Sequence, residues 1–180
     1  FKEISNVNFE KYNKRIECRG PDEKVVICNK NFVNPDTYHN YTFNRLSIID
    51  LSKNASQPMQ SDEFNSLIMF NGEIYNHPEL RVRCIQRGFN TWKGHSDTEV
   101  LLVHLALFGL EATLQQLRGM FAFALYDRKL KKLFLCRDRV GKKPLFWSKI
   151  NDNFIFSSVG NVRVMSPVLT GRIISVSIPS

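Results

Sequence analysis

The stretch Met120–Tyr126 constrains the fold most strongly, because none of its residues is charged or strongly polar. A strand that is apolar on both faces has to lie in the centre of a covered sheet. Asp127-Arg128-Lys129 then turns the chain, and Lys132–Arg137 is predicted to return as the partner strand of a hairpin. Helical patterns are few and paired, whereas strands cluster in hairpins. We therefore predict an α+β fold with antiparallel sheets.

Two helices with clear end signals are predicted before this hairpin. Pro78 is suited to a first helical turn, and Gly88 to the position after the last. Ser96 and Glu99 form a capping box, Ser-x-x-Glu, at the start of a second helix, which Gly109 ends. The other expected elements are strands at Lys24–Cys28, Tyr41–Leu51, Leu145–Lys149, Phe154–Ser158 and Arg172–Ile178, a helix at Leu110–Arg118, and loops at Asn29–Asn40 and Ser52–Asp62.

The stretch Asn71-Gly72-Glu73 is predicted to form a turn between an apolar strand, Ser66–Phe70, and the helix that begins near Pro78. Glycine lets another group approach its N–H closely. An Asn amide beside such an N–H offers two donors aimed at one point, which is the geometry that holds the oxyanion of an acyl-transfer intermediate. The alternative is an ordinary Asn-Gly turn.

Arg45 and Asp97 are charged residues that each have two interpretations. Arg45 lies in an apolar stretch, either as a side chain extending to solvent at a strand edge or as a fork that clamps a carboxylate. Asp97 falls in the first turn of a predicted helix, where its negative charge interacts favourably with the helix dipole. It could also anchor the ammonium group of a substrate.

Charge and cysteine content limit the functional classes. The chain has 180 residues and a net charge of +8, but its basic residues are interspersed with acidic ones, so nucleic-acid binding is not expected. No apolar run is long enough to cross a membrane, and the first residues do not form a signal peptide. We expect no metal site, because the cysteines are too far apart. We also expect the protein to be cytoplasmic and its thiols to be reduced. The cysteines are Cys18, Cys28, Cys84 and Cys136.

Six motifs, in order and near the expected spacing, resemble the glutaminase domain of glutamine-hydrolysing asparagine synthetases, a class II glutamine amidotransferase. The similarity covers roughly Ile16 to Ser158. The motifs are Cys18-Arg19-Gly20-Pro21-Asp22, Arg45-Leu46-Ser47-Ile48-Ile49-Asp50, Phe70-Asn71-Gly72-Glu73-Ile74-Tyr75-Asn76, His95-Ser96-Asp97-Thr98-Glu99, Gly119-Met120-Phe121-Ala122-Phe123-Ala124 and Arg137-Asp138-Arg139-Val140-Gly141-Lys142-Lys143-Pro144-Leu145.

The resemblance implies an N-terminal-nucleophile hydrolase fold, a four-layer α/β/β/α sandwich of antiparallel sheets. It also implies roles for particular residues. Arg45 would clamp the α-carboxylate of glutamine and Asp97 would bind its α-ammonium. Asn71 and the N–H of Gly72 would form the oxyanion hole, and Glu73 would help to hold the amino-acid end of the substrate. These charges complement a zwitterion.

The chain departs from the family pattern in three places. The family's nucleophile is an N-terminal Cys, whereas residue 1 is Phe and Cys18 stands where the family carries His. The family match is expected to end at Ser158, because Val159 replaces the family's Glu. We therefore assign residues 1–158 to an N-terminally incomplete amidotransferase domain and 159–180 to a divergent tail. The ATP pyrophosphatase loop of the synthetase domain is absent, and the chain beginning at Phe1 is expected to be inactive.

The implied chemistry is hydrolysis of L-glutamine to glutamate and ammonia, which a synthetase domain or subunit would use for ATP-dependent amidation of aspartate. No cofactor is expected in this domain, because ATP and Mg²⁺ belong to the synthetase domain. A homodimer is compatible with the family. One alternative is a glutamine-binding relic or regulatory module without turnover. Another is a Cys–His hydrolase that uses Cys18 with a histidine, for which the candidates are His39, His77, His95 and His104.

Overall fold

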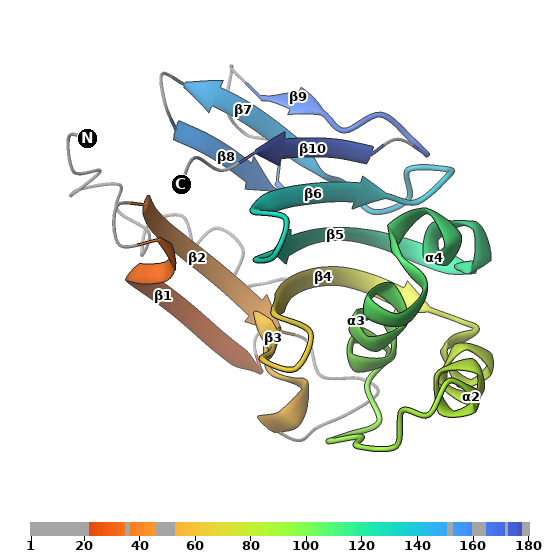
Figure 1. Ribbon diagram of the computed structural model, residues 1–180. Helices are drawn as coiled ribbons and strands as arrows, with labels where there is room; N and C mark the ends of the chain where they lie inside the picture. Colours follow the sequence, from red (N-terminus) through yellow and green to blue (C-terminus); the bar gives the residue numbers. More distant parts are fainter. Residues whose placement is uncertain are drawn as a thin grey trace. The chain divides into compact units, whose positions relative to one another are not determined.

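The computed structural model (Figure 1) describes residues 22–34, 37–45, 53–150, 153–159, 165–171 and 173–177. The chain forms two compact units, Phe1–Leu51 and Ser52–Ser180. In the first unit, β1 (Glu23–Asn34) and β2 (Thr37–Arg45) form an antiparallel hairpin. The prediction of a loop at Asn29–Asn40 is therefore wrong for most of that segment. Pairing between the two strands, such as that of Cys28 with Asn40, outweighs the low strand propensity of Asn.

The second unit is built around a five-stranded antiparallel sheet with the order β10-β6-β5-β4-β3. The central strand, β5, is buried along most of its length, as its sequence predicts. The edge strand β10 lies within the C-terminal segment Arg172–Ile178, where a strand was predicted, and it pairs with β6. The strands are β3 (Met59–Ser61), β4 (Ser66–Ile74), β5 (Gly119–Asp127), β6 (Lys132–Arg137) and β10 (Ile173–Ser177).

Three α-helices pack on one side of this sheet (Figure 1). They are α2 (His77–Gln86), α3 (Asp97–Phe108) and α4 (Leu110–Gln116), and a short 3₁₀ helix, η2 (Lys53–Ala55), precedes β3. All three α-helices form near the predicted positions. Helix α3 is the most buried of the three, because every residue from Val100 to Leu105 is buried. The core between helices and sheet contains Ile68, Phe70, Ile74, Leu80, Val100, Leu101, Leu105, Phe121 and Phe123.

A three-stranded antiparallel sheet, with the order β8-β7-β9, follows in the same unit. Its strands are β7 (Phe146–Ile150), β8 (Asn153–Ser157) and β9 (Ser166–Pro167). Antiparallel sheets and a separate layer of helices confirm the predicted α+β class. Among the described residues, no helix is long and apolar enough to cross a membrane.

Candidate functional site

The candidate site lies along one edge of β4. The adjoining strand β3 pairs with β4 only as far as the pair Met59–Ile68. Beyond that point, side chains replace the missing strand: the Phe70 N–H donates to Gln57 Oε1 at 2.6 Å and the Ile74 N–H donates to Asp97 Oδ2 at 3.0 Å. Alternate residues of a strand direct their N–H groups to the same edge. The Gly72 N–H therefore lies on this edge, midway between two N–H groups that have side-chain acceptors.

The Gly72 N–H is the open donor in this row, since no acceptor for it is found within the described residues. The predicted turn at Asn71-Gly72-Glu73 is wrong, because β4 runs on to Ile74 and the chain turns only at Tyr75 and Asn76. The reason is that Gly72 pairs with Phe121 in the register of β4 and β5, far away in the sequence.

Glycine is required at position 72 by close packing against β5. A Cβ atom there would lie 2.1 Å from the Met120 carbonyl oxygen and 2.7 Å from the Phe121 Cα, and φ is +157°. A Cβ atom on Gly119, in the facing strand β5, would likewise lie 2.1 Å from the Glu73 carbonyl oxygen. Two glycines thus let the backbones of β4 and β5 approach closely at the level of the open N–H.

Asn71 and Glu73 project from the opposite face of the sheet from the helices, because Phe70 and Ile74 on either side contribute to the helix-facing core. Both side chains are half-buried. Asn71 pairs in register with Ala122 of β5. The Gly72 N–H and the Asn71 and Glu73 side chains therefore all lie near the C-terminal end of β4.

Asp97 is brought to this edge by the first turn of α3. The Ser96 hydroxyl accepts the Glu99 N–H at 3.2 Å, which confirms the predicted helix start. Glu99 does not complete the capping box: its carboxylate instead accepts the N–H groups of Lys93, at 2.7 Å, and Gly94, at 3.0 Å. Helix α3 is therefore fixed at its N-terminus both by its cap and by the preceding loop.

Asp97 is a buried carboxylate, with 6% of its surface exposed, and no Lys or Arg forms an ion pair with it within the described residues. Burial raises its pKa, and the charge of Glu73 acts in the same direction. The backbone N–H groups of Ile74 and Thr98 and the nearby His77 oppose the increase without cancelling it. A cation that entered the site beside Asp97 would relieve this cost.

Comparison with known proteins gives the family. The sequence model of the glutamine amidotransferase domain matches residues 1–171. The chain belongs to this family. Asparagine synthetase [glutamine-hydrolyzing] 1 of Bacillus subtilis (strain 168) is 40% identical over 146 residues, which is 81% of this chain and 22% of that protein. A putative asparagine synthetase [glutamine-hydrolyzing] 2 of Methanocaldococcus jannaschii is 34% identical over 87% of this chain and 32% of its own length.

Solved structures give the same fold. The glutamine phosphoribosylpyrophosphate amidotransferase of B. subtilis, complexed with ADP and GMP, superposes with a TM-score of 0.61. It is 20% identical, and the match covers 76% of this chain and 32% of that one. The fold of the domain is thus that of the amidotransferases, as the resemblance implied. The chain spans about a fifth to a third of the length of the relatives that it matches.

The structure of the amidotransferase domain brings together most, but not all, of the predicted site residues. Asn71, Gly72, Glu73 and Asp97 lie at the end of β4 or beside it. Arg45 is the last residue of β2, and its side chain lies outside the described part of the structure. Its pairing with a substrate carboxylate stays a prediction.

The alternative of an internal cysteine nucleophile gains no support from the domain's described thiols. Cys84 and Cys136 are both buried, and burial raises the pKa of Cys84 to about 11 and that of Cys136 further. Neutral thiols are poor nucleophiles. The residue that this alternative requires, Cys18, lies outside the described residues.

Gln57 is the residue of the site that sequence reasoning missed. It falls in the segment Ser52–Asp62, which was expected to be a polar loop, yet only 7% of its surface is exposed. Its side chain contacts both β4 and the start of α3. Local sequence carries no sign of this role, since a buried Gln and an exposed one look alike in a polar segment.

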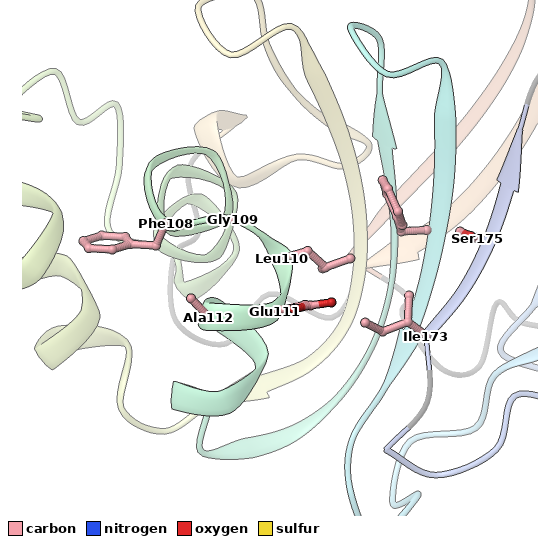
Figure 2. Close-up of a pocket in the computed structure, with 8 residues that line it drawn as sticks. Phe108, Gly109, Leu110, Glu111, Ala112, Ile173 and Ser175 are labelled. Atoms are coloured by element: carbon pink, nitrogen blue, oxygen red, sulfur yellow. The ribbon is translucent and has the colours of Figure 1, made fainter.

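A groove of about 640 Å³ lies elsewhere in the domain, between the α3–α4 turn and the strands β6 and β10 (Figure 2). Figure 2 shows Leu110 and Glu111 on one wall and Ile173 on the other. None of the predicted glutamine-binding residues lines it. The groove is therefore distinct from the site at the end of β4.

Proposed function

We propose that the site at the end of β4 binds L-glutamine and, together with an N-terminal Cys, hydrolyses it to glutamate and ammonia. The observation that carries this proposal is that a carboxylate and an N–H group, each with an unfilled bonding position, lie on the same edge of β4. Among the described residues, Asp97 is a buried carboxylate without a Lys or Arg ion pair, and the Gly72 N–H is a donor without an acceptor. Glutamine offers an ammonium group for the first and an amide carbonyl oxygen for the second.

The spacing of the two groups supports the same ligand. Asp97 is bonded to the Ile74 N–H, two residues along β4 from Gly72. Two strand residues span about 7 Å, which suits a ligand that carries its α-ammonium and its side-chain amide at opposite ends. Arg45 would take the α-carboxylate, Glu73 would assist at the ammonium end, and the Asn71 amide would add a second donor at the carbonyl end.

The chemistry is acyl transfer through a thioester. The cysteine thiolate adds to the amide carbon, and the carbonyl oxygen becomes an oxyanion that the Asn71 amide and the Gly72 N–H stabilise. Collapse expels ammonia, which takes up the proton from the thiol, and leaves a γ-glutamyl thioester. Water then displaces the thiol and releases glutamate.

The partner that fits this product is a synthetase module that consumes ammonia. Relatives over most of this chain are named as glutamine-hydrolysing asparagine synthetases, and they are three to five times as long as the matched region. We propose that the ammonia serves ATP-dependent amidation of aspartate, with ATP and Mg²⁺ bound in that module, and that the protein acts in the cytoplasm.

Adding an N-terminal Cys-Gly-Ile segment before Phe1 tests the proposal. The extended chain is expected to release ammonia from L-glutamine, measured by a coupled glutamate dehydrogenase assay. The matched control carries Ser-Gly-Ile and should be inactive, because the hydroxyl lacks the nucleophilicity of a thiolate. An extended chain that folds and binds glutamine but releases no ammonia would show a binding module without turnover. Release of ammonia by the chain beginning at Phe1, abolished by Cys18→Ser, would support the internal nucleophile.

A further inference from the structure

Gln57 occupies a position where the sheet would otherwise continue. The register of β3 and β4 pairs Met59 with Ile68, so the next pair on the same side of the ladder would join residue 57 to Phe70. The backbone does not make this pair. The side chain of Gln57 does so instead, since its Oε1 accepts the Phe70 N–H at 2.6 Å.

The other end of the same amide reaches the helix that carries Asp97. Gln57 Nε2 lies 3.5 Å from the Thr98 hydroxyl, one residue after Asp97. Thr98 is itself buried, with 3% of its surface exposed. The buried Gln57 amide therefore contacts both β4, on one side of Gly72, and the first turn of α3. In that turn, Asp97 accepts the N–H of Ile74, which lies on the other side of Gly72.

We infer that Gln57 is a positioning residue for the oxyanion donor of the amidotransferase site: by holding the Phe70 N–H and Thr98 together, it fixes the direction of the Gly72 N–H relative to Asp97. This inference rests on the proposed function for its catalytic consequence. Its structural part, the orientation of three N–H groups on one strand edge, does not depend on turnover.

The role follows from the spacing of the bonded N–H groups. Phe70 and Ile74 are fixed from outside the sheet by Gln57 and Asp97, and Gly72 lies midway between them. Glycine is the most flexible residue of the backbone, so its N–H direction depends on how its neighbours are held, by β5 on one edge and by these two anchors on the other. An oxyanion donor has to be aligned before the charge develops, because alignment during the reaction would cost activation energy.

The test uses the chain extended with Cys-Gly-Ile and three variants. Gln57→Met keeps the length of the side chain but removes both hydrogen bonds, and Gln57→Glu keeps an acceptor for the Phe70 N–H. Gln60→Met is the matched control, since Gln60 is exposed and its side chain bonds only to Asp62 among the described residues. We expect Gln57→Met to lower kcat about tenfold with KM within about twofold, Gln57→Glu to recover part of the loss, and Gln60→Met to match the parent.

A second measurement separates failure of this inference from failure of the proposed function. Amide NMR signals of Phe70, Gly72 and Ile74 are compared in the same variants, and this needs no turnover. We expect Gln57→Met to shift the Gly72 signal and to speed its hydrogen exchange, whereas Gln60→Met leaves both unchanged. A Gln57→Met variant with a parental kcat, or with parental Phe70 and Gly72 signals, overturns the inference. An inactive parent with a displaced Gly72 signal in Gln57→Met overturns only the proposed function.

Discussion

Asp97 and Asp138 are both buried aspartates beside the β4–β5 pair, but their carboxylates have opposite properties. Asp138 has 1% of its surface exposed and accepts four backbone N–H groups, from Phe121, Val140, Lys142 and Lys143, at 2.9 to 3.2 Å. Burial pushes the pKa of Asp138 upward, but these four bonds outweigh it and lower the pKa. Asp97 has fewer donors, and burial leaves its pKa raised.

The surroundings of Asp138 explain why it is satisfied. Asp138 directly follows the last paired residue of β6 and lies opposite Phe121 in the β5–β6 register. Its carboxylate therefore accepts an N–H at the end of the ladder as well as N–H groups of the loop that follows. Arg137 completes the loop by donating to the carbonyl oxygens of Gly141, Lys143 and Val168. The Asp138 carboxylate and the Arg137 guanidinium thus both have partners within the protein, which is what a structural role requires.

The difference separates a carboxylate whose charge the fold satisfies from one whose charge the fold leaves without a Lys or Arg ion pair among the described residues. A structural carboxylate is stabilised in its charged form by the folded chain, whereas Asp97 is left in need of a positive charge. Both lie near Gly72: Asp138 holds Phe121, which is the register partner of Gly72, and Asp97 holds Ile74. We therefore expect the same substitution, Asp to Asn, to have different consequences for stability at the two positions.

The largest expected effect is on stability. Asp138→Asn replaces one acceptor oxygen by an NH₂ group that faces two buried N–H donors, and it should lower the free energy of unfolding on the order of 4 kcal/mol. Asp97→Asn keeps an acceptor for the Ile74 N–H and removes a buried charge, so it should change stability by less than about 1 kcal/mol. Urea unfolding followed by circular dichroism measures both.

Glu63→Gln is the control for removing a carboxylate, because Glu63 is exposed. It should leave stability unchanged. Similar losses in Asp138→Asn and Asp97→Asn would mean that Asp97 is also a structural residue, and the contrast between the two carboxylates would then fail.

The next effect is on glutamine binding. Asp97→Asn removes the proposed partner of the ligand ammonium and should weaken binding by at least about 2 kcal/mol. Arg45→Ala should do the same through the α-carboxylate. Titration calorimetry of each variant against the parent gives the values. Unchanged affinity in both, with a parent that binds, would favour the structural interpretations: a helix-dipole role for Asp97 and a solvent-directed side chain for Arg45.

The sequence predicted those parts of the fold whose causes are local. Ser96 and Gly109 bound α3 correctly because caps act within one turn, and the apolar residues of β5 required a central strand. It did not predict that β4 continues through Gly72, because this depends on Gly119 and Phe121 on a strand that forms much later in the chain.

Asn71, Gly72, Glu73 and Asp97 were identified as site residues from motifs. The structure places them at or beside one end of β4, and their roles toward glutamine stay predictions. The roles of Gln57 and Asp138 were not predicted, because each depends on where a ladder of strand pairs stops. A ladder end is set by the register of two strands, and register cannot be read from either strand alone.

The smallest effect is on pH dependence, and it has opposite signs at the two aspartates. The pKa of Asp138 is lowered in the folded state, so its stabilisation is present above the unfolded pKa near 3.8 and is lost as pH falls through the folded pKa. The pKa of Asp97 is raised, so its contribution is greatest below 3.8 and is lost as pH rises through the folded pKa. Relative to Asp97→Asn, the parent should therefore lose stability as the pH rises from 3.8 through the folded pKa of Asp97.

Glutamine should reverse this behaviour, because its ammonium group favours the ionised form of Asp97 and lowers the carboxyl pKa in the complex. Binding is then accompanied by release of a proton wherever the pH lies between the pKa values of the complex and of the free domain. Calorimetry in two buffers with different ionisation enthalpies measures the number of protons released. We expect a release in the parent that is greatest in mildly acidic solution and is absent in Asp97→Asn. Equal release in both would assign the proton to another group and would remove Asp97 from the ammonium site.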